Sequence, residues 1–255
     1  MARRSGLVDR LLHRRSVARW RRALANVGQA SLERLRQQRT QARELSHVLE
    51  EHARLAEERL ILPRIGNNNF QRPRGTDWAW RPALWRGPIA RRGLAAASSP
   101  VTMGGDVSLF HDCRSSELTL RQIRNVREQD LAPFGLQMDV FQFDGSFLSI
   151  VIDLPPESCV GLRTKHLIRI DPLVEVEKPI EIFARLNIQH GPNVEKIVRE
   201  LPASGDRAVE FDLAYVKLNE KRIEKMWLDL IFEGPEMNLV TIRDITMCRY
   251  PRAEL

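Results

Sequence analysis

The tripeptide His111-Asp112-Cys113 places three reactive side chain types in a row. A cysteine nucleophile needs a base that folding brings next to its sulfur, and His166 and His190 are the candidates for that role. Sequence neighbours on a strand point to opposite faces, so adjacency alone does not make a catalytic pair. The alternative is a loop at the end of a strand. A hydrolase that uses Cys113 and His111 is therefore kept as an alternative function, and we assign no catalytic residues.

The histidines and cysteines show no metal-binding spacing. The six histidines contain no H-x-H or HExxH pair, and Cys113, Cys159 and Cys248 form no CxxC pair. We therefore expect no transition-metal site and no cofactor. An odd, sparse set of cysteines also argues against a disulfide framework, which favours reduced thiols and a cytoplasmic protein.

Asp244 stands at an unusual position for a carboxylate. On the alternation set by Val240 and Ile242 it faces the core, where an unpaired charge is costly. Three resolutions stay open: a bulge that turns it outward, pairing with an arginine such as Arg249 or one from the tryptophan-rich segment, or a structural calcium ion.

Trp78, Trp80 and Trp85 are the candidate ligand-binding residues. Their indole rings are suited to stacking on sugar rings. Neighbouring arginines would also suit single-stranded nucleic acid, whose bases stack on aromatic side chains beside a cationic track. These arginines are Arg72, Arg74, Arg81 and Arg86. The competing interpretation is that the three tryptophans anchor an irregular segment to the domain beneath.

Positive charge is concentrated at the N-terminal end. Residues 1–100 hold 21 Lys+Arg against 8 Asp+Glu, whereas residues 101–255 hold 19 against 25. The candidate phosphate or membrane contacts are Arg14, Arg15, Arg19, Arg21 and Arg22. This basic arm is compatible with an anionic membrane surface, with nucleic acid, with a transit peptide, or with docking on the acidic body or a second copy.

Two helices are expected in the arm, residues 1–62. Leu7–Val27 has apolar residues at helical spacing, Gly28 marks a break, and Ser31 is an acceptable N-cap. The second helix continues until Pro63, and its near-heptad stripe makes self-association through residues 31–62 possible. No apolar run is long enough to span a bilayer, and no secretory signal is apparent.

A connector and a β-rich domain follow the arm. Residues 63–100 are rich in Pro, Gly and Trp, which predicts an irregular segment docked on the next domain. Residues 101–255 show short alternating segments, clearest at Glu181–Ile188, with few helical patterns between them. Asp144-Gly145 between two apolar runs predicts a two-residue hairpin, and 194–201 fits either helix or strand. The fold class expected is mainly β: an antiparallel β-sandwich, jelly-roll-like, behind a basic α-helical arm.

Several short runs resemble an uncharacterised family of alphaproteobacterial proteins, a domain of unknown function. These runs include Phe143–Leu148, Phe183–Asn187, Asn219–Arg222 and Phe232–Asn238, together with Thr76–Pro82. The resemblance implies a bacterial source and no particular activity. The strand Val240–Ile245 is also similar to the closing strand of carbohydrate-binding jelly-roll modules, a likeness at the level of the fold.

These observations favour a non-catalytic interaction or structural protein whose sandwich binds glycan. The alternatives are binding of nucleic acid or an anionic membrane surface by the basic helix, and the Cys113/His111 hydrolase. The partners expected are accordingly a glycan, an anionic membrane surface, nucleic acid, or a second copy of the chain.

Overall fold

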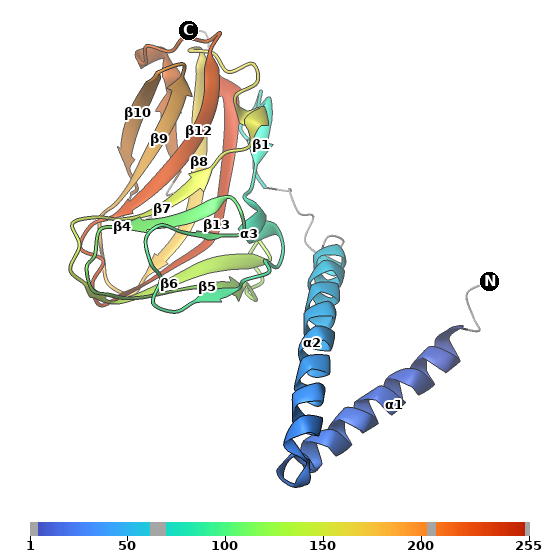
Figure 1. Ribbon diagram of the computed structural model, residues 1–255. Helices are drawn as coiled ribbons and strands as arrows, with labels where there is room; N and C mark the ends of the chain where they lie inside the picture. Colours follow the sequence, from blue (N-terminus) through green and yellow to red (C-terminus); the bar gives the residue numbers. More distant parts are fainter. Residues whose placement is uncertain (1–4, 62–69, 203–207, 253–255) are drawn as a thin grey trace. The chain divides into compact units, whose positions relative to one another are not determined.

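The computed structural model describes residues 5–61, 70–202 and 208–252. The chain folds as two compact units, residues 1–53 and residues 54–255. The first is a helical hairpin and the second holds the sandwich (Figure 1).

The helices of the first unit begin and end close to the positions predicted from the sequence. Helix α1 spans Ser5–Ala25, the short 3-10 helix η1 spans Val27–Gln29, and α2 spans Leu32–Ile61. The Ser31 hydroxyl accepts a hydrogen bond from the Arg34 amide at 3.4 Å, so Ser31 caps α2 as predicted. Arg19 Nη2 donates to Gln41 Oε1 at 2.9 Å and ties α1 to α2. No helix in the described part of the chain is long and apolar enough to cross a membrane.

The second unit is an antiparallel β-sandwich, as expected. Sheet A has the strand order β11-β8-β13-β6-β5-β2, and β1 also pairs with β13. Its strands are β1 (Trp78–Trp80), β2 (Gly93–Leu94), β5 (Ser116–Arg124), β6 (Phe134–Phe143), β8 (His166–Val176), β11 (Val209–Asp212) and β13 (Asn238–Pro251). Among the described residues of this unit, three short helices lie between strands: α3 (Ala83–Arg86), η2 (Pro156–Ser158) and η3 (Leu213–Tyr215).

Sheet B has the strand order β10-β9-β12-β7-β4-β3. Its strands are β3 (Val101–Met103), β4 (Val107–His111), β7 (Leu148–Asp153), β9 (Ile182–His190), β10 (Asn193–Glu200) and β12 (Ile223–Phe232). The ambiguous stretch at 194–201 is therefore a strand for most of its length. Every other residue of β9 and β12 faces the core, so Leu186, Leu228 and Leu230 are fully buried between the sheets.

The predicted hairpin at Asp144-Gly145 is wrong. Strands β6 and β7, which flank it, belong to different sheets, so the chain crosses there from sheet A to sheet B. A two-residue hairpin would need a positive φ that Gly145 does not adopt. The crossing is held by Asp112, whose Oδ1 accepts from the Ser146 amide at 2.7 Å.

The connector, where the structure describes it, is docked on the sandwich. Strand β1 adds to β13, and Trp85 of α3 is fully buried with its Nε1 donating to the Ile242 carbonyl at 2.9 Å. The Gln122 side chain accepts from the Ile89 amide and donates to the Gly87 carbonyl. These bonds satisfy buried polar groups of a segment with little regular structure.

Candidate functional site

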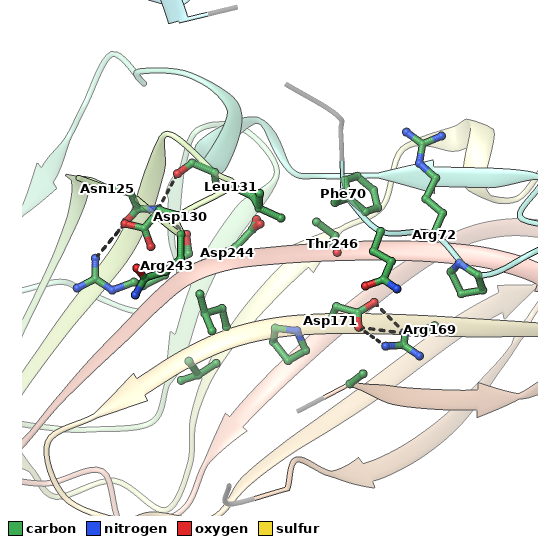
Figure 2. A pocket seen from close by; sticks show the side chains of 18 of the residues that line it. Phe70, Arg72, Asn125, Asp130, Leu131, Arg169, Asp171, Arg243, Asp244 and Thr246 are labelled. Atoms are coloured by element: carbon green, nitrogen blue, oxygen red, sulfur yellow. Dashed lines mark hydrogen bonds and ion pairs between the residues drawn. The ribbon is translucent and has the colours of Figure 1, made fainter. Parts of the chain in front are cut away.

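A cleft of the sandwich lies on the outer face of sheet A. It has a volume of about 730 Å³, and its floor is formed by outward residues of β8, β11 and β13 (Figure 2). The strand register brings these residues together: Asp171 lies opposite Thr246, and Leu173 lies opposite Asp244. Because side chains alternate along a strand, their neighbours Ile170 and Ile245 point into the core.

A β-bulge in β13 supplies the polar residues at one end of the floor. The pairing of β13 with β8 shifts register between Ile242 and Asp244. Ile242 and Ile245 are both buried although they are three residues apart, so the bulge changes which residues face inward. Arg243 and Asp244 consequently line the cleft.

Asp244 is turned outward by this bulge and is also paired with Arg81 of the tryptophan-rich segment. Arg81 Nε donates to Asp244 Oδ1 at 2.8 Å, and Nη2 donates to Oδ2 at 2.7 Å. Burial raises the pKa of Asp244, while Arg81 opposes that shift. Two of the explanations predicted from the sequence, the bulge and the pairing with an arginine of the tryptophan-rich segment, therefore occur together. With both oxygens engaged by a guanidinium, the carboxylate needs no calcium ion for neutralisation.

Two loops form the walls of the cleft. On one side is the segment 70–73, in which the Arg72 guanidinium lies 5.1 Å from the Phe70 ring centre. On the other side is the loop 125–132, held by Asn125, whose Nδ2 donates to the carbonyls of Ala132 and Arg243. Neither wall is part of a strand. The strands therefore position the floor of the cleft, and side-chain contacts position its two walls.

Asp130 is the least satisfied group of the cleft. Its side chain is only 4% exposed, and its Oδ2 accepts from the Arg127 amide at 2.9 Å. Arg243 Nη1 lies 4.0 Å from Oδ2. Oδ1 has no hydrogen-bond partner among the described residues. A buried acceptor without a donor is energetically costly. Oδ1 has almost no exposed surface, so a ligand that donates to it, and so relieves that cost, requires a local shift of the loop 125–132.

Other polar and charged side chains of the cleft are paired with one another. Arg169 Nη2 donates to Asp171 Oδ1 at 2.7 Å, and the Tyr250 hydroxyl donates to Glu210. Burial and the neighbouring Glu210 carboxylate both raise the pKa of Tyr250, so its hydroxyl is a permanent donor near neutral pH. The lining includes three arginines, Arg72, Arg169 and Arg243, and four carboxylates, those of Asp130, Asp171, Glu210 and Asp244.

His111, Asp112 and Cys113 form a structural corner. His111 Nδ1 accepts from the Cys113 amide at 3.2 Å, so its Nε2 carries the proton and donates to the Ala97 carbonyl at 3.1 Å. Neither nitrogen of His111 is left to take a proton from Cys113. Burial raises the pKa of the Cys113 thiol, which opposes thiolate formation.

The two histidines expected as alternative bases are engaged elsewhere. His166 begins β8, where its Nδ1 accepts from the Arg163 amide at 3.0 Å. His190 ends β9, where its Nδ1 accepts from the Asn219 amide at 3.4 Å. This corner therefore shows no arrangement for nucleophilic catalysis by Cys113.

The three predicted tryptophans lie outside the lining of the cleft. Trp85 is fully buried, so its ring has no face to offer a ligand, and it anchors the connector instead. Trp78 and Trp80 are half-buried against the core, with ring centres 6.4 Å apart in a stacked arrangement. They lie opposite Arg249 and Met247 of β13, which are themselves buried.

The predicted basic residues of the arm all lie on α1 and are exposed: Arg14, Arg15, Arg19, Arg21 and Arg22. Within the described residues, no group of three or more His, Cys, Asp or Glu side chains is arranged to hold a metal ion. Cys113, Cys159 and Cys248 are all free thiols. The cytoplasmic location stays a prediction.

Sequence reasoning missed most of the cleft. Arg169 and Asp171 stand at the polar positions of an alternating strand, so their shared face was readable from the sequence. Asp130 lies in a loop without any such pattern. Its place beside the cleft depends on contacts with residues more than a hundred positions away, such as Arg243.

Comparison with solved structures finds distant likenesses to the sandwich. The enzymatically active domain of tailspike protein 4 from bacteriophage CBA120 has a TM-score of 0.39 at 7% identity, covering 56% of this chain and 19% of that one. The CBM22-1 xylan-binding domain of Paenibacillus barcinonensis Xyn10C has a TM-score of 0.36 at 8% identity, covering 71% and 100%. The family 11 carbohydrate-binding module of Clostridium thermocellum, in complex with a β-1,3-1,4-mixed-linked tetrasaccharide, has a TM-score of 0.32 at 11% identity, covering 62% and 96%.

These values describe a shared general architecture and carry no information about a ligand. The distant likeness to carbohydrate-binding modules that the sequence predicted is thus confirmed for the general fold alone. A search of curated proteins finds no significant match. The family resemblance extends over residues 1–255, and the chain belongs to the family of unknown function DUF6478.

Proposed function

We propose that the sandwich is a non-catalytic binding module and that its cleft holds a carbohydrate. The observation that carries the proposal is the Asp130 carboxylate, a nearly buried acceptor whose Oδ1 has no donor among the described residues. A sugar hydroxyl is a donor of suitable size, and its hydrogen bond to a charged acceptor is worth about 1.5–3 kcal/mol.

The charge of the cleft favours a neutral ligand. Three arginines and four carboxylates line it, so neither a polyanion nor a polycation meets a surface of one opposite sign. Most of these charges are already paired, as in Arg169 with Asp171 and Arg81 with Asp244. Such pairs present donors and acceptors side by side, which matches hydroxyl groups that both donate and accept.

Apolar surfaces complete the match to a sugar ring. Phe70, Leu131, Pro172 and Leu173 line the same cleft as the polar groups. A pyranose has polar edges and apolar C–H faces, so it needs both kinds of contact. Sites for small molecules commonly combine apolar walls with a few fixed polar groups.

A glycan microarray probed with the labelled full-length chain tests the proposal. Positive glycans are then titrated by calorimetry, with xylohexaose and the β-1,3-1,4-mixed-linked tetrasaccharide included as defined probes. We expect Asp130→Asn to weaken binding about tenfold or more, because the amide is a weaker acceptor than the carboxylate.

The matched control is Asp153→Asn, which removes a half-exposed carboxylate paired with Lys225 on sheet B. This variant is expected to bind like the wild type. Absence of binding across the array, or equal losses for the two variants, overturns the proposal.

A further inference from the structure

A second cavity lies within the helical unit, at the bend between α1 and α2. It has a volume of about 590 Å³. Its lining residues are Arg19, Trp20, Arg22, Ala23, Asn26, Gln29, Ala30, Arg34, Gln37, Gln38 and Gln41. The turn at η1 brings the end of α1 and the beginning of α2 to the same cavity.

The lining of this cavity is positively charged and rich in hydrogen-bonding groups. Arg19, Arg22 and Arg34 contribute three guanidiniums, and no Asp or Glu is among the residues that line it. Five side-chain amides accompany them. Arginine forks match phosphate geometry, and amides can donate to and accept from the edges of bases.

Trp20 adds an aromatic ring at the same place. The Arg19 guanidinium lies 5.7 Å from its ring centre, and Arg19 Nη2 is held by Gln41 Oε1 at 2.9 Å. The indole is only partly exposed, so it is held in a position to stack on a base.

The distribution of arginine on α1 distinguishes between two polyanions. Arg14 and Arg15, like Arg21 and Arg22, lie about 100° apart around the helix axis, and both pairs fall on the same side of α1 as the exposed Leu11. A helix lying in a membrane interface needs one broad apolar face opposite its charges. Since this side of α1 mixes the arginines with the apolar Leu11 and Ala18, charged and apolar residues are not separated as a membrane interface requires, and a flexible phosphate chain suits α1 better than a lipid surface.

We propose that this cavity binds single-stranded nucleic acid. Arg19, Arg22 and Arg34 contact backbone phosphates, Trp20 stacks on a base, and the amides contact base edges. This site is independent of the glycan cleft, because every residue that lines it lies within the helical unit.

Fluorescence anisotropy with a labelled 20-nucleotide single strand, as DNA and as RNA, tests the proposal on the full chain. The variant R19Q/R22Q/R34Q removes the three cavity arginines. The control R36Q/R39Q/R43Q removes the same charge from α2 residues that do not line the cavity. Circular dichroism establishes that both variants keep their helices.

We expect the cavity variant to bind about tenfold more weakly or worse at 50 mM salt, and the control to lose about threefold or less. The slope of log K against log salt should fall by about 2 in the cavity variant, at about 0.7 per phosphate contact in a single strand. Trp20→Leu should weaken binding without changing that slope, because stacking releases no counterions.

Three outcomes overturn the proposal. The first is equal loss in the cavity variant and the control, which reports net charge alone. The second is that neither the DNA nor the RNA oligonucleotide binds at 50 mM salt. The third is binding to phosphatidylglycerol vesicles, but not to oligonucleotides, that depends on the three cavity arginines.

Discussion

Replacing Arg81 by methionine should destabilise the sandwich strongly, because it leaves the Asp244 carboxylate buried without its partner. The Arg81 side chain is fully buried, the Asp244 side chain is 13% exposed, and bonds of 2.8 and 2.7 Å join them. Removing one partner of a buried ion pair costs about 3–5 kcal/mol. Methionine keeps most of the volume, so the loss reports the charge rather than a cavity.

The loss should depend on pH in a defined direction. Burial already raises the pKa of Asp244, and Arg81 is the main influence that lowers it. Without Arg81 the folded-state pKa rises further above the unfolded value, so the folded variant binds a proton more tightly. The destabilisation should therefore be largest near pH 8 and shrink as the pH falls through the raised pKa.

Urea unfolding followed by tryptophan fluorescence at pH 8 and pH 5 measures both effects. Subtracting the wild-type value at each pH cancels the titration of other groups. Arg81→Lys should lose less, because a lysine keeps the charge but not the two-pronged geometry. The double variant R81M/D244L should recover most of the loss. If R81M loses less than about 1 kcal/mol, or loses the same amount at both pH values, Arg81 does not neutralise a buried Asp244 carboxylate.

Three smaller changes test other parts of the fold. Gly145→Ala places a Cβ 2.5 Å from Asp112 Oδ1 and should lower the melting temperature, whereas Gly93→Ala, whose Cβ meets nothing nearer than 3.8 Å, should not. Trp85→Phe removes the indole bond to a carbonyl of β13 and should cost about 1–3 kcal/mol by urea unfolding, with no change contradicting its anchoring role. Burial raises the pKa of Cys248 to about 11, so iodoacetamide at pH 8 should label it only after unfolding, as judged by mass spectrometry.

The sandwich was predictable because its strands each bury one face. In β9 the residues Ile182, Ala184, Leu186 and Ile188 are buried between the sheets, and this alternation is visible in the sequence. Helix α2 was predictable for a local reason as well, since Ser31 begins it and no Gly or Pro interrupts it. Both signals need only residues that are close together in the sequence.

The crossing at Gly145 was not predictable from such signals. Asp-Gly between apolar runs is typical of a hairpin, but the assignment of a strand to a sheet depends on its distant neighbours. Here β6 pairs with β13, while β7 pairs with β12 and β4. Asp112 then binds the Ser146 amide and hydroxyl and fixes the crossing.

The cleft was unpredictable for a related reason. Its carboxylate at Asp244 is reached by Arg81 from 163 positions away, and the bulge that exposes it has no sequence signature. Sequence reasoning found the possible partners of Asp244 but could not choose among them. The sequence around Asp130 contains no pattern that predicts its burial, because the Asp130 side chain is buried by segments that are distant in the sequence and come close only in the fold.

Arg81 links the stability of the sandwich to the shape of its cleft. It lies 5.3 Å from the ring centre of Phe70, which lines the cleft, and it neutralises Asp244, which lines it too. Loss of Arg81 should therefore weaken both folding and glycan binding, whereas Asp130→Asn should weaken binding with little effect on folding. If R81M still bound glycan with wild-type affinity at a temperature where it is folded, the wall formed by residues 70–73 would have no part in recognition.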